Sequence, residues 1–208
     1  MKMEENMNME ERIIEAAKLV FVRKGYKATT MVDIAAEVGI SRTALHYYFH
    51  TKEVMFEAIF AQLIGTLLPN IDMIMDEENT ILEKLPAFID AYLAALLQNQ
   101  LFPLFVINEM NRDPAHLFSA VVKNISQIQP LIRLQSQLLD EMERGLLNKV
   151  PLEDVVSTFI GLIIFPILVR NPLVTVFMNG EDGAFDKFIS RRKQLIYDVI
   201  YHLLAPYY

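Results

Sequence analysis

The chain has 208 residues, a formal net charge of −7 and a hydrophobic content of 53%. This length is long for one small domain and short for two full ones, which favours one compact body with a small appended module. The sequence contains no cysteine, which excludes disulfides, thiol catalysis and thiolate metal sites and is typical of a cytoplasmic protein.

The first residues, MKMEENMNMEER, form a polar tail with too many acidic residues and no apolar run for a secretory signal. The most lipid-like segment, Val155 to Val169, is fifteen residues long and contains Ser157 and Pro166. A helix needs roughly 20 apolar residues to span a bilayer. We therefore expect this segment in a protein interior, and we expect no membrane partner.

Charge is distributed unevenly along the chain. Between Arg12 and Lys52 there are seven basic and three acidic residues, a net charge of +4. From Val54 to Tyr208 there are eleven basic and eighteen acidic residues, a net charge of −7. Such a split is typical of a basic nucleic-acid reader attached to a body with a different role.

The first two helices are predicted from an apolar stripe and from capping residues. Apolar residues from Ile13 to Phe21 recur at helical spacing, and Gly25 is expected to end that helix. Thr30 can cap a second helix, with Asp33 three residues later in a variant of the capping box. Gly39 is expected to end this helix after barely two turns.

A third short helix follows directly. Ser41 can cap a helix from Arg42 to Tyr48, with Leu45 and Phe49 on its inner side, and Thr51 opens a fourth helix that continues toward Leu67. Two very short helices joined by a Gly-x-Ser turn predict a helix-turn-helix.

Beyond Pro69 the pattern stays helical, and the acidic segment from Asp76 to Thr80 is expected to be a loop. No segment alternates as a strand would. The further expected helices run at about Glu83 to Asn99, Phe102 to Asn111, His116 to Leu147 with room for a kink at Pro130, Leu152 to Val169, and Gly183 to Leu204. The predicted fold class is all-α.

The third helix has side chains suited to the major groove of DNA, which admits one helix. Arg42 can donate hydrogen bonds to O6 and N7 of one guanine at the same time, and Thr43 and Ala44 can contact a thymine methyl. His46 and Tyr47 can donate to bases or phosphates, and backbone N–H groups at Ser41 can hold a phosphate. The candidate DNA-binding residues are Thr30, Ser41, Arg42, Thr43, Ala44, His46, Tyr47, Tyr48 and Lys52, of which Tyr48 and Lys52 are best suited to phosphates.

Other interpretations of these residues exist. Exposed basic side chains are often only solvated surface, and the run HYYF could be core packing. Consecutive helical positions point about 100° apart, however, so at least one of Tyr47 and Tyr48 must face outward. His46 and His50 have a metal-ligand spacing, but His50 falls past the expected helix end and no nearby acid completes a set of ligands. We expect no metal and no cofactor.

The stretch KGYKATTMVDIAAEVGISRTALHYYFHTKEVMFEAI resembles the N-terminal DNA-binding region of TetR/AcrR-family transcriptional regulators. The residues that match the family pattern are Gly25 and Tyr26, Thr29 and Thr30, Ile34 and Ala35, Gly39 to Ser41, Leu45 to Phe49, and Lys52 to Met55. One position departs: His46 stands where the family has an aromatic residue, which makes Tyr47 the expected aromatic contact. The segment FVINEMNRDP is similar to a segment of some AcrR-like members.

The resemblance implies an N-terminal three-helix helix-turn-helix domain, residues 1–53, on a larger C-terminal helical ligand-binding and dimerisation domain, residues 54–208. It also implies a homodimer in which the last two long helices of each subunit form a four-helix bundle. An apolar stripe on the last helix, from Phe185 to Leu203, supports this, although burial within one subunit is an alternative. Candidate ligand-binding residues are Phe88, Tyr92, Leu96, Phe102, Phe105 and Met110.

The sequence therefore predicts a ligand-responsive transcriptional regulator, a repressor in the cytoplasm, whose dimer binds a palindromic double-stranded operator and is released by a small apolar or amphipathic effector. A helical small-molecule binding protein without specific DNA reading is the alternative. No Gly-rich phosphate loop, GxSxG elbow or HExxH motif occurs, so enzymatic activity is not expected.

Overall fold

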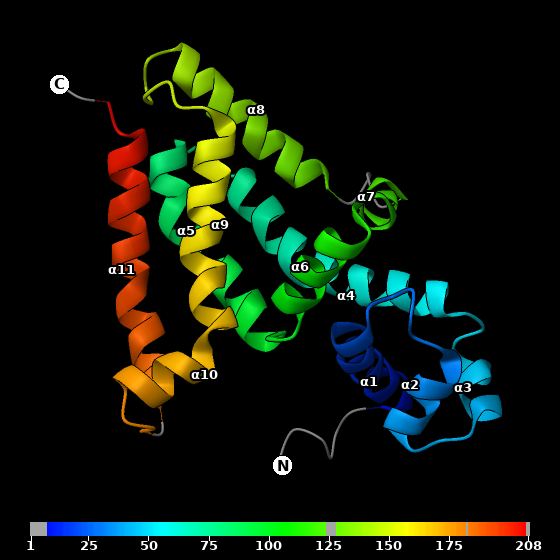
Figure 1. Ribbon diagram of the computed structural model, residues 1–208. Coiled ribbons are helices and arrows are strands. Elements are labelled where there is room, and N and C mark those ends of the chain that lie inside the picture. The colour runs from blue at the N-terminus through cyan, green and yellow to red at the C-terminus, as the bar shows by residue number, and fades with distance from the viewer. Residues whose placement is uncertain (1–7, 124–127, 182, 207–208) are drawn as a thin grey trace. The chain divides into compact units, whose positions relative to one another are not determined.

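The computed structural model describes residues 8–123, 128–181 and 183–206, and within these ranges it consists of helices without any strand (Figure 1). The all-α prediction is confirmed. The helices are α1 (Met9–Lys24), α2 (Met31–Val38), α3 (Arg42–Tyr48), α4 (Lys52–Met75), α5 (Ile81–Gln98), α6 (Phe102–Arg112), α7 (Pro114–Lys123), α8 (Gln129–Glu143), α9 (Leu152–Leu168), α10 (Arg170–Pro172), the π-helical turn η2 (Leu173–Phe177) and α11 (Ala184–Leu204).

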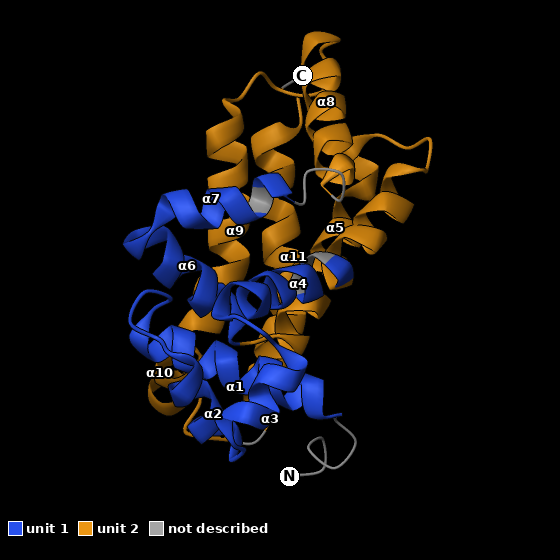
Figure 2. Ribbon diagram, turned by 90° about the vertical axis from the view of Figure 1, so that its right-hand side faces the viewer, with its two compact units in different colours: residues 1–65, 101–125 blue, residues 66–100, 126–208 orange. Residues whose placement is uncertain are grey.

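Two compact units make up the fold (Figure 2). The N-terminal unit comprises Met1–Gly65 and Leu101–Ile125, and the C-terminal unit comprises Thr66–Gln100 and Ser126–Tyr208. Packing therefore groups α6 and α7 with α1, α2 and α3, and α4 contributes residues to each unit. The functional division at residue 53 stays a prediction.

Aromatic packing explains why α6 belongs to the N-terminal unit. Phe21 of α1, Phe56 of α4 and Phe105 of α6 are fully buried, and their ring centroids lie 5.1 to 6.1 Å apart. A hydrogen bond supports the same arrangement, since the buried Glu109 of α6 accepts from the backbone N–H of Tyr26 at 2.9 Å. Aromatic pairs of this kind stabilise beyond the area that they bury.

The C-terminal unit is built on an apolar core. Its helices α5, α9 and α11 pack against one another, and α8 packs on α5. Thr80 begins α5 with a capping box to Glu83, and the buried Glu141 of α8 accepts a hydrogen bond from the backbone N–H of Ile81 at 3.1 Å. The largest fully buried side chains of this core are Ile89, Leu93, Ile163 and Ile196.

Three sequence expectations need correction. The fourth helix continues through Pro69 to Met75. The single helix expected from His116 to Leu147 is wrong, because α7 ends at Lys123 and α8 begins at Gln129; residues 124–127 of that expected helix lie outside the described residues, as does the tail 1–7. Pro130 lies at the start of α8, where proline removes no helical hydrogen bond, so it marks a beginning and not a kink.

By length and composition one unbroken helix of the described residues, α4, could span a bilayer. The bent pairs α5–α6 and α9 with α10–η2 meet the same criterion as broken spans, and the second pair contains most of the segment from Val155 to Val169. In the structure α4 buries Met55, Phe56 and Ile59 in the N-terminal unit and Leu68 and Ile71 in the C-terminal unit. Burial against other helices thus accounts for its apolar composition.

Candidate DNA-binding surface and ligand cavity

The turn between α2 and α3 is set by one glycine and one serine. Gly39 has a φ of 81°, in the left-handed region, and its N–H donates to the carbonyl of Ala35 at 3.0 Å. Ser41 is extended, and its hydroxyl accepts a hydrogen bond from the N–H of Ala44 at 3.1 Å. Helix α3 therefore begins at Arg42, as the sequence predicts.

The two sides of α3 differ sharply. Leu45 is 0% exposed and Phe49 is buried, whereas Tyr47 is 81% exposed. We call the exposed residues of α3 the α3 outer face; they are Arg42, Thr43, Ala44, Tyr47 and Tyr48. His46 is half-buried at its edge. The two tyrosine rings make an edge-to-face contact at 5.2 Å, and because both side chains are exposed neither belongs to the core.

Thr30 is used as a cap. Its hydroxyl donates to Asp33 at 2.8 Å and accepts from the N–H of Asp33 at 3.2 Å. The Asp33 carboxylate also receives a hydrogen bond from Lys24 at 2.6 Å, and this bond, followed by the bonds from Thr30, lowers the pKa of Asp33 to about 2. The beginning of α2 is thus fixed by a charged cap.

The side chain of Lys52 binds backbone carbonyl groups. Its ammonium donates to the carbonyls of Tyr26 at 2.7 Å, Lys27 at 3.3 Å and Thr29 at 3.0 Å, and it lies 4.3 Å from the centre of the Tyr26 ring. An ammonium has three N–H donors, so this arrangement leaves none for a phosphate. These bonds connect the start of α4 to the α1–α2 turn. The phosphate contact expected for Lys52 stays a prediction.

Residues of α6 and α7 that sequence reasoning missed support this turn from the other side. The Asn108 amide donates to the carbonyl of Val22 at 3.1 Å, and Asp113 pairs with Lys27 at 3.1 Å. His116 stacks on the Tyr26 ring at 4.1 Å and lies 3.0 Å from the Glu53 carboxylate. For Asn108 and Asp113 the signal was the resemblance of FVINEMNRDP to a segment of other regulators, whereas His116 lies outside that segment.

The C-terminal unit contains an apolar cavity of about 550 Å³. Apolar side chains of five helices form most of its wall: Ile71, Ile81, Leu85, Phe88, Leu131, Leu134, Leu138, Leu152, Val155, Val156, Phe159, Ile160, Ile200 and Leu204. Tyr92, Gln135 and Glu153 are its polar lining residues. Burial raises the pKa of Tyr92, whose ring meets the Phe159 ring edge to face at 5.7 Å.

The cavity includes two of the six ligand-binding candidates, Phe88 and Tyr92. Leu96 is buried in the core of the same unit without lining the cavity. Phe102 and Phe105 are buried in the N-terminal unit, with their ring centroids 6.0 Å apart. Met110 is 56% exposed. The expected grouping failed because the packing of α6 depends on contacts with α1, which helical periodicity does not report.

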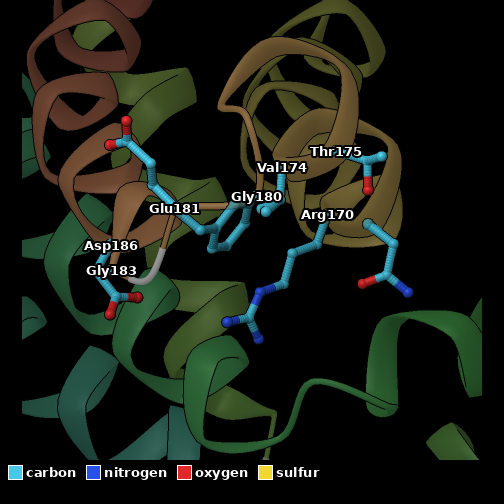
Figure 3. Close-up of a pocket in the computed structure, with 9 residues that line it drawn as sticks. Arg170, Val174, Thr175, Gly180, Glu181, Gly183 and Asp186 are labelled. Atoms are coloured by element: carbon cyan, nitrogen blue, oxygen red, sulfur yellow. The ribbon is translucent and has the colours of Figure 1, made fainter.

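A smaller pocket of about 270 Å³ lies beside α10 in the same unit (Figure 3). Its wall carries both charge signs, from Arg170, Glu181 and Asp186. The Arg170 guanidinium donates to Gln100 at 2.8 Å and lies 5.0 Å from the Phe185 ring, so it is already partnered. Across the described ranges, no three His, Asp or Glu side chains group as metal ligands.

Comparison with known proteins decides the family. Residues 13–59 match the sequence model described as bacterial regulatory proteins, tetR family, and this range contains α2, α3 and the turn between them. Residues 13–59 are thus a helix-turn-helix region of the tetR family of bacterial regulatory proteins. Its helix-turn-helix is of the DNA-binding type that these regulators carry.

Curated relatives of the chain are distant. Nucleoid occlusion factor SlmA of Idiomarina loihiensis is 26% identical over 165 residues, which are 75% of the chain and 81% of the relative. The HTH-type transcriptional repressor KstR2 of Mycolicibacterium smegmatis is 31% identical over 86 residues, or 41% of the chain and 42% of the relative. The match to KstR2 thus spans less than half of that protein.

Solved structures of similar fold cover nearly all of the chain. The TetR-family regulator PfmR of Thermus thermophilus has a TM-score of 0.60 at 20% identity, over 90% of this chain and 97% of that one. A candidate fatty acid metabolism regulator of Clostridium perfringens has a TM-score of 0.67 at 19% identity, over 90% and 97%. At these identities the likeness concerns the fold.

Proposed function

We propose that the chain is a ligand-responsive repressor of the cytoplasm, whose dimer binds a palindromic operator and is released when a small apolar or amphipathic molecule occupies the cavity. The observation that carries this proposal is the division of α3, with Leu45 and Phe49 buried and the α3 outer face exposed. A helix of this kind can enter the major groove while its inner side stays packed.

The proposed DNA contacts follow from side-chain chemistry. Arg42 bonds a guanine edge, Thr43 and Ala44 contact a thymine methyl, and Tyr47 contacts a base or a phosphate. His46, like Tyr47, contacts a base or a phosphate, and Tyr48 and the backbone at Ser41 hold phosphates. Thr30 contributes through its position at the start of α2. Lys52 is left out because its donors are used by carbonyls.

Exposed apolar residues on α9 and α11 support the dimer. Phe165 of α9 is 62% exposed, and Val156, Leu195 and Val199 are also exposed on these two helices. Exposed apolar surface of this kind is typical of an interface, and regulators of this family bind DNA as dimers. A dimer would place its two α3 helices about 34 Å apart, one turn of DNA.

The cavity supports the effector part of the proposal. A volume of about 550 Å³ with an apolar wall is typical of small-molecule sites. Helix α4 carries Met55 in the core of the N-terminal unit and Ile71 in the cavity wall. Ligand binding regulates DNA binding only when the two ligands prefer different conformations of the protein.

Selection of bound fragments from random DNA tests this function. We expect enrichment of two-fold symmetric sites whose half-sites lie about 10 base pairs apart, centre to centre. A parallel selection with ligand-bound protein should lose this enrichment. If the selection without ligand enriches no common DNA sequence, the proposal is contradicted.

A carrier without DNA reading is the second candidate, and the size of the cavity favours it. A gel-shift on DNA upstream of the chain's own gene separates the two, because a carrier gives no salt-sensitive, sequence-dependent shift.

A further inference from the structure

We propose that the effector is a lipophilic cation, an ammonium or related group on an apolar body, and that free carboxylates are rejected. This inference rests on the proposed function for its regulatory meaning, but the binding preference belongs to the cavity itself and is measured without DNA.

Charge within the cavity has one sign. Among its lining residues there is no lysine, arginine or histidine, and the only carboxylic acid is Glu153 at the start of α9. No hydrogen bond or ion pair of the Glu153 carboxylate occurs within the described residues. A cationic head group beside Glu153 would gain a partner, whereas a carboxylate there would meet a like charge.

Basic residues on the neighbouring helix faces are occupied. The Lys84 ammonium is buried and donates to Gln137 at 3.0 Å. The Arg133 guanidinium, on α8 between two lining leucines, pairs with Asp72 at 3.1 Å and Asp76 at 2.7 Å. Recruiting either cation for an anionic ligand would break these bonds, and a buried anion without a partner costs several kcal/mol.

Aromatic rings give a second reason for the preference. Phe88, Tyr92 and Phe159 all line the cavity, and the faces of such rings attract cations. Burial raises the pKa of Tyr92, so its hydroxyl stays neutral at physiological pH and presents an oxygen as an acceptor. The wall therefore contains aromatic rings and oxygen-bearing side chains, which suit a cation, and no cationic group that would pair with an anion.

The field of the whole unit acts in the same direction. The C-terminal unit has nine basic and fifteen acidic residues, a net charge of −6, whereas the N-terminal unit has ten basic and eleven acidic, a net charge of −1. Negative potential raises the local concentration of cationic ligands and lowers that of anionic ones. Because Glu153 is exposed, its own contribution is small, on the order of a few-fold in affinity.

The test uses three probes that share a ten-carbon alkyl tail: decyltrimethylammonium, decanol and decanoate. Each is used below its micellar concentration. Binding to the full-length protein at pH 7 is followed by calorimetry. We expect the ammonium to bind at least about tenfold more tightly than the carboxylate, with the alcohol between them. Equal or tighter binding of decanoate, or no binding of any probe, would overturn the inference.

Variants show whether the cavity is responsible. Glu153→Gln should weaken the ammonium about two- to fivefold and leave decanol unchanged, whereas the neighbouring Asp154→Asn, outside the cavity wall, should change neither. Leu134→Trp should fill the cavity and abolish binding of all three probes. Ammonium binding that survives Leu134→Trp, or that is unchanged by Glu153→Gln, would place the site elsewhere.

A last arm adds DNA. If the ammonium binds in the cavity with the expected preference but leaves a protein–DNA complex intact, the preference stands and the proposed regulation fails. If the complex dissociates with decanoate and not with the ammonium, the regulation stands and the preference fails.

Discussion

The two units of this chain are specified in different ways. In the N-terminal unit α1, α2 and α3 each begin at a side-chain cap, from Asn8, Thr30 and Ser41. In the C-terminal unit α5 also has such a cap, from Thr80, but α8, α9 and α11 begin without one, as does α6 of the N-terminal unit. Apolar packing holds α8, α9 and α11 in place. Directional bonds fix a backbone within narrow limits, whereas apolar contacts tolerate rearrangement.

This difference suits the proposed division of labour. A base-reading helix must hold its outer face in one position. The bond of Ser41 fixes the start of α3, and the bonds of Lys52 connect the residues after α3 to those before α2. A cavity that exchanges ligands needs walls that can move, and side chains such as Leu131, Leu134 and Ile160 make no directional bond. Substitutions in each unit can therefore test the contrast.

The largest effect is expected from core truncation, applied to each unit in turn. Leu45→Ala and Ile163→Ala both remove side chains that are 0% exposed, and each should cost about 2–5 kcal/mol of unfolding free energy. Leu45→Ala should abolish DNA binding and retain probe binding in the cavity. Ile163→Ala should weaken probe binding more than it weakens DNA binding. Denaturation, gel-shift and calorimetry check this; identical loss of both activities in both variants would contradict separate roles.

The second-largest effect is expected from Arg42→Ala. Loss of a bidentate guanine contact should weaken binding to the selected operator by about 1–3 kcal/mol and relax the preference at one base pair. Lys149→Ala is the matched control, because it removes one exposed positive charge from the C-terminal unit. Filter-binding titrations measure the affinity of both variants for operator and for random DNA. An equal loss of affinity for the two DNAs in Arg42→Ala would contradict the base-reading role.

Lys52→Met tests whether this lysine is structural. Its three bonds to carbonyls should be worth about 1–3 kcal/mol of unfolding free energy, and the salt dependence of DNA binding should keep its slope. Lys27→Met, which breaks an exposed pair with Asp113, should cost less than about 1 kcal/mol. A flatter salt dependence in Lys52→Met without loss of stability would restore the phosphate contact.

Two glycines should respond with opposite signs. Gly39→Ala places a side chain at a φ of 81° and should destabilise by about 1 kcal/mol, although no atom lies within 4 Å of the added carbon. Gly65 lies inside α4 with equal space, so Gly65→Ala should stabilise by up to about 1 kcal/mol. Thermal midpoints of the two variants measure the difference, and a shared sign would contradict the argument.

The smallest effect concerns pH. The folded pKa of Asp33 is lowered to about 2, so its cap stabilises α2 above the ordinary carboxyl range and this stabilisation is lost as pH falls from about 4 toward 2. Circular dichroism midpoints across this range should fall less steeply for Asp33→Asn than for the wild type. Parallel slopes would show that the cap contributes nothing to the acid sensitivity.

The accuracy of sequence reasoning followed the same division between units. Helix α3 has the predicted bounds because Ser41, Gly39 and the spacing of Leu45 and Phe49 are local signals. The membership of α6 in the N-terminal unit depends on bonds between distant residues, such as Tyr26 to Glu109, and no local pattern reports them. Apolar periodicity likewise indicated helices in the C-terminal unit but not which side chains enclose the cavity.

The central claim is that one chain reads DNA with α3 and is regulated through the cavity. The most direct measurement is a fluorescence anisotropy titration of the selected operator with full-length protein, repeated with the ligand that binds most tightly and with the Leu134→Trp variant. The account predicts saturation at two chains per duplex, release by the ligand for the wild type, and no release for the variant. A complex that forms equally on scrambled DNA, or that ignores a bound ligand, would contradict it.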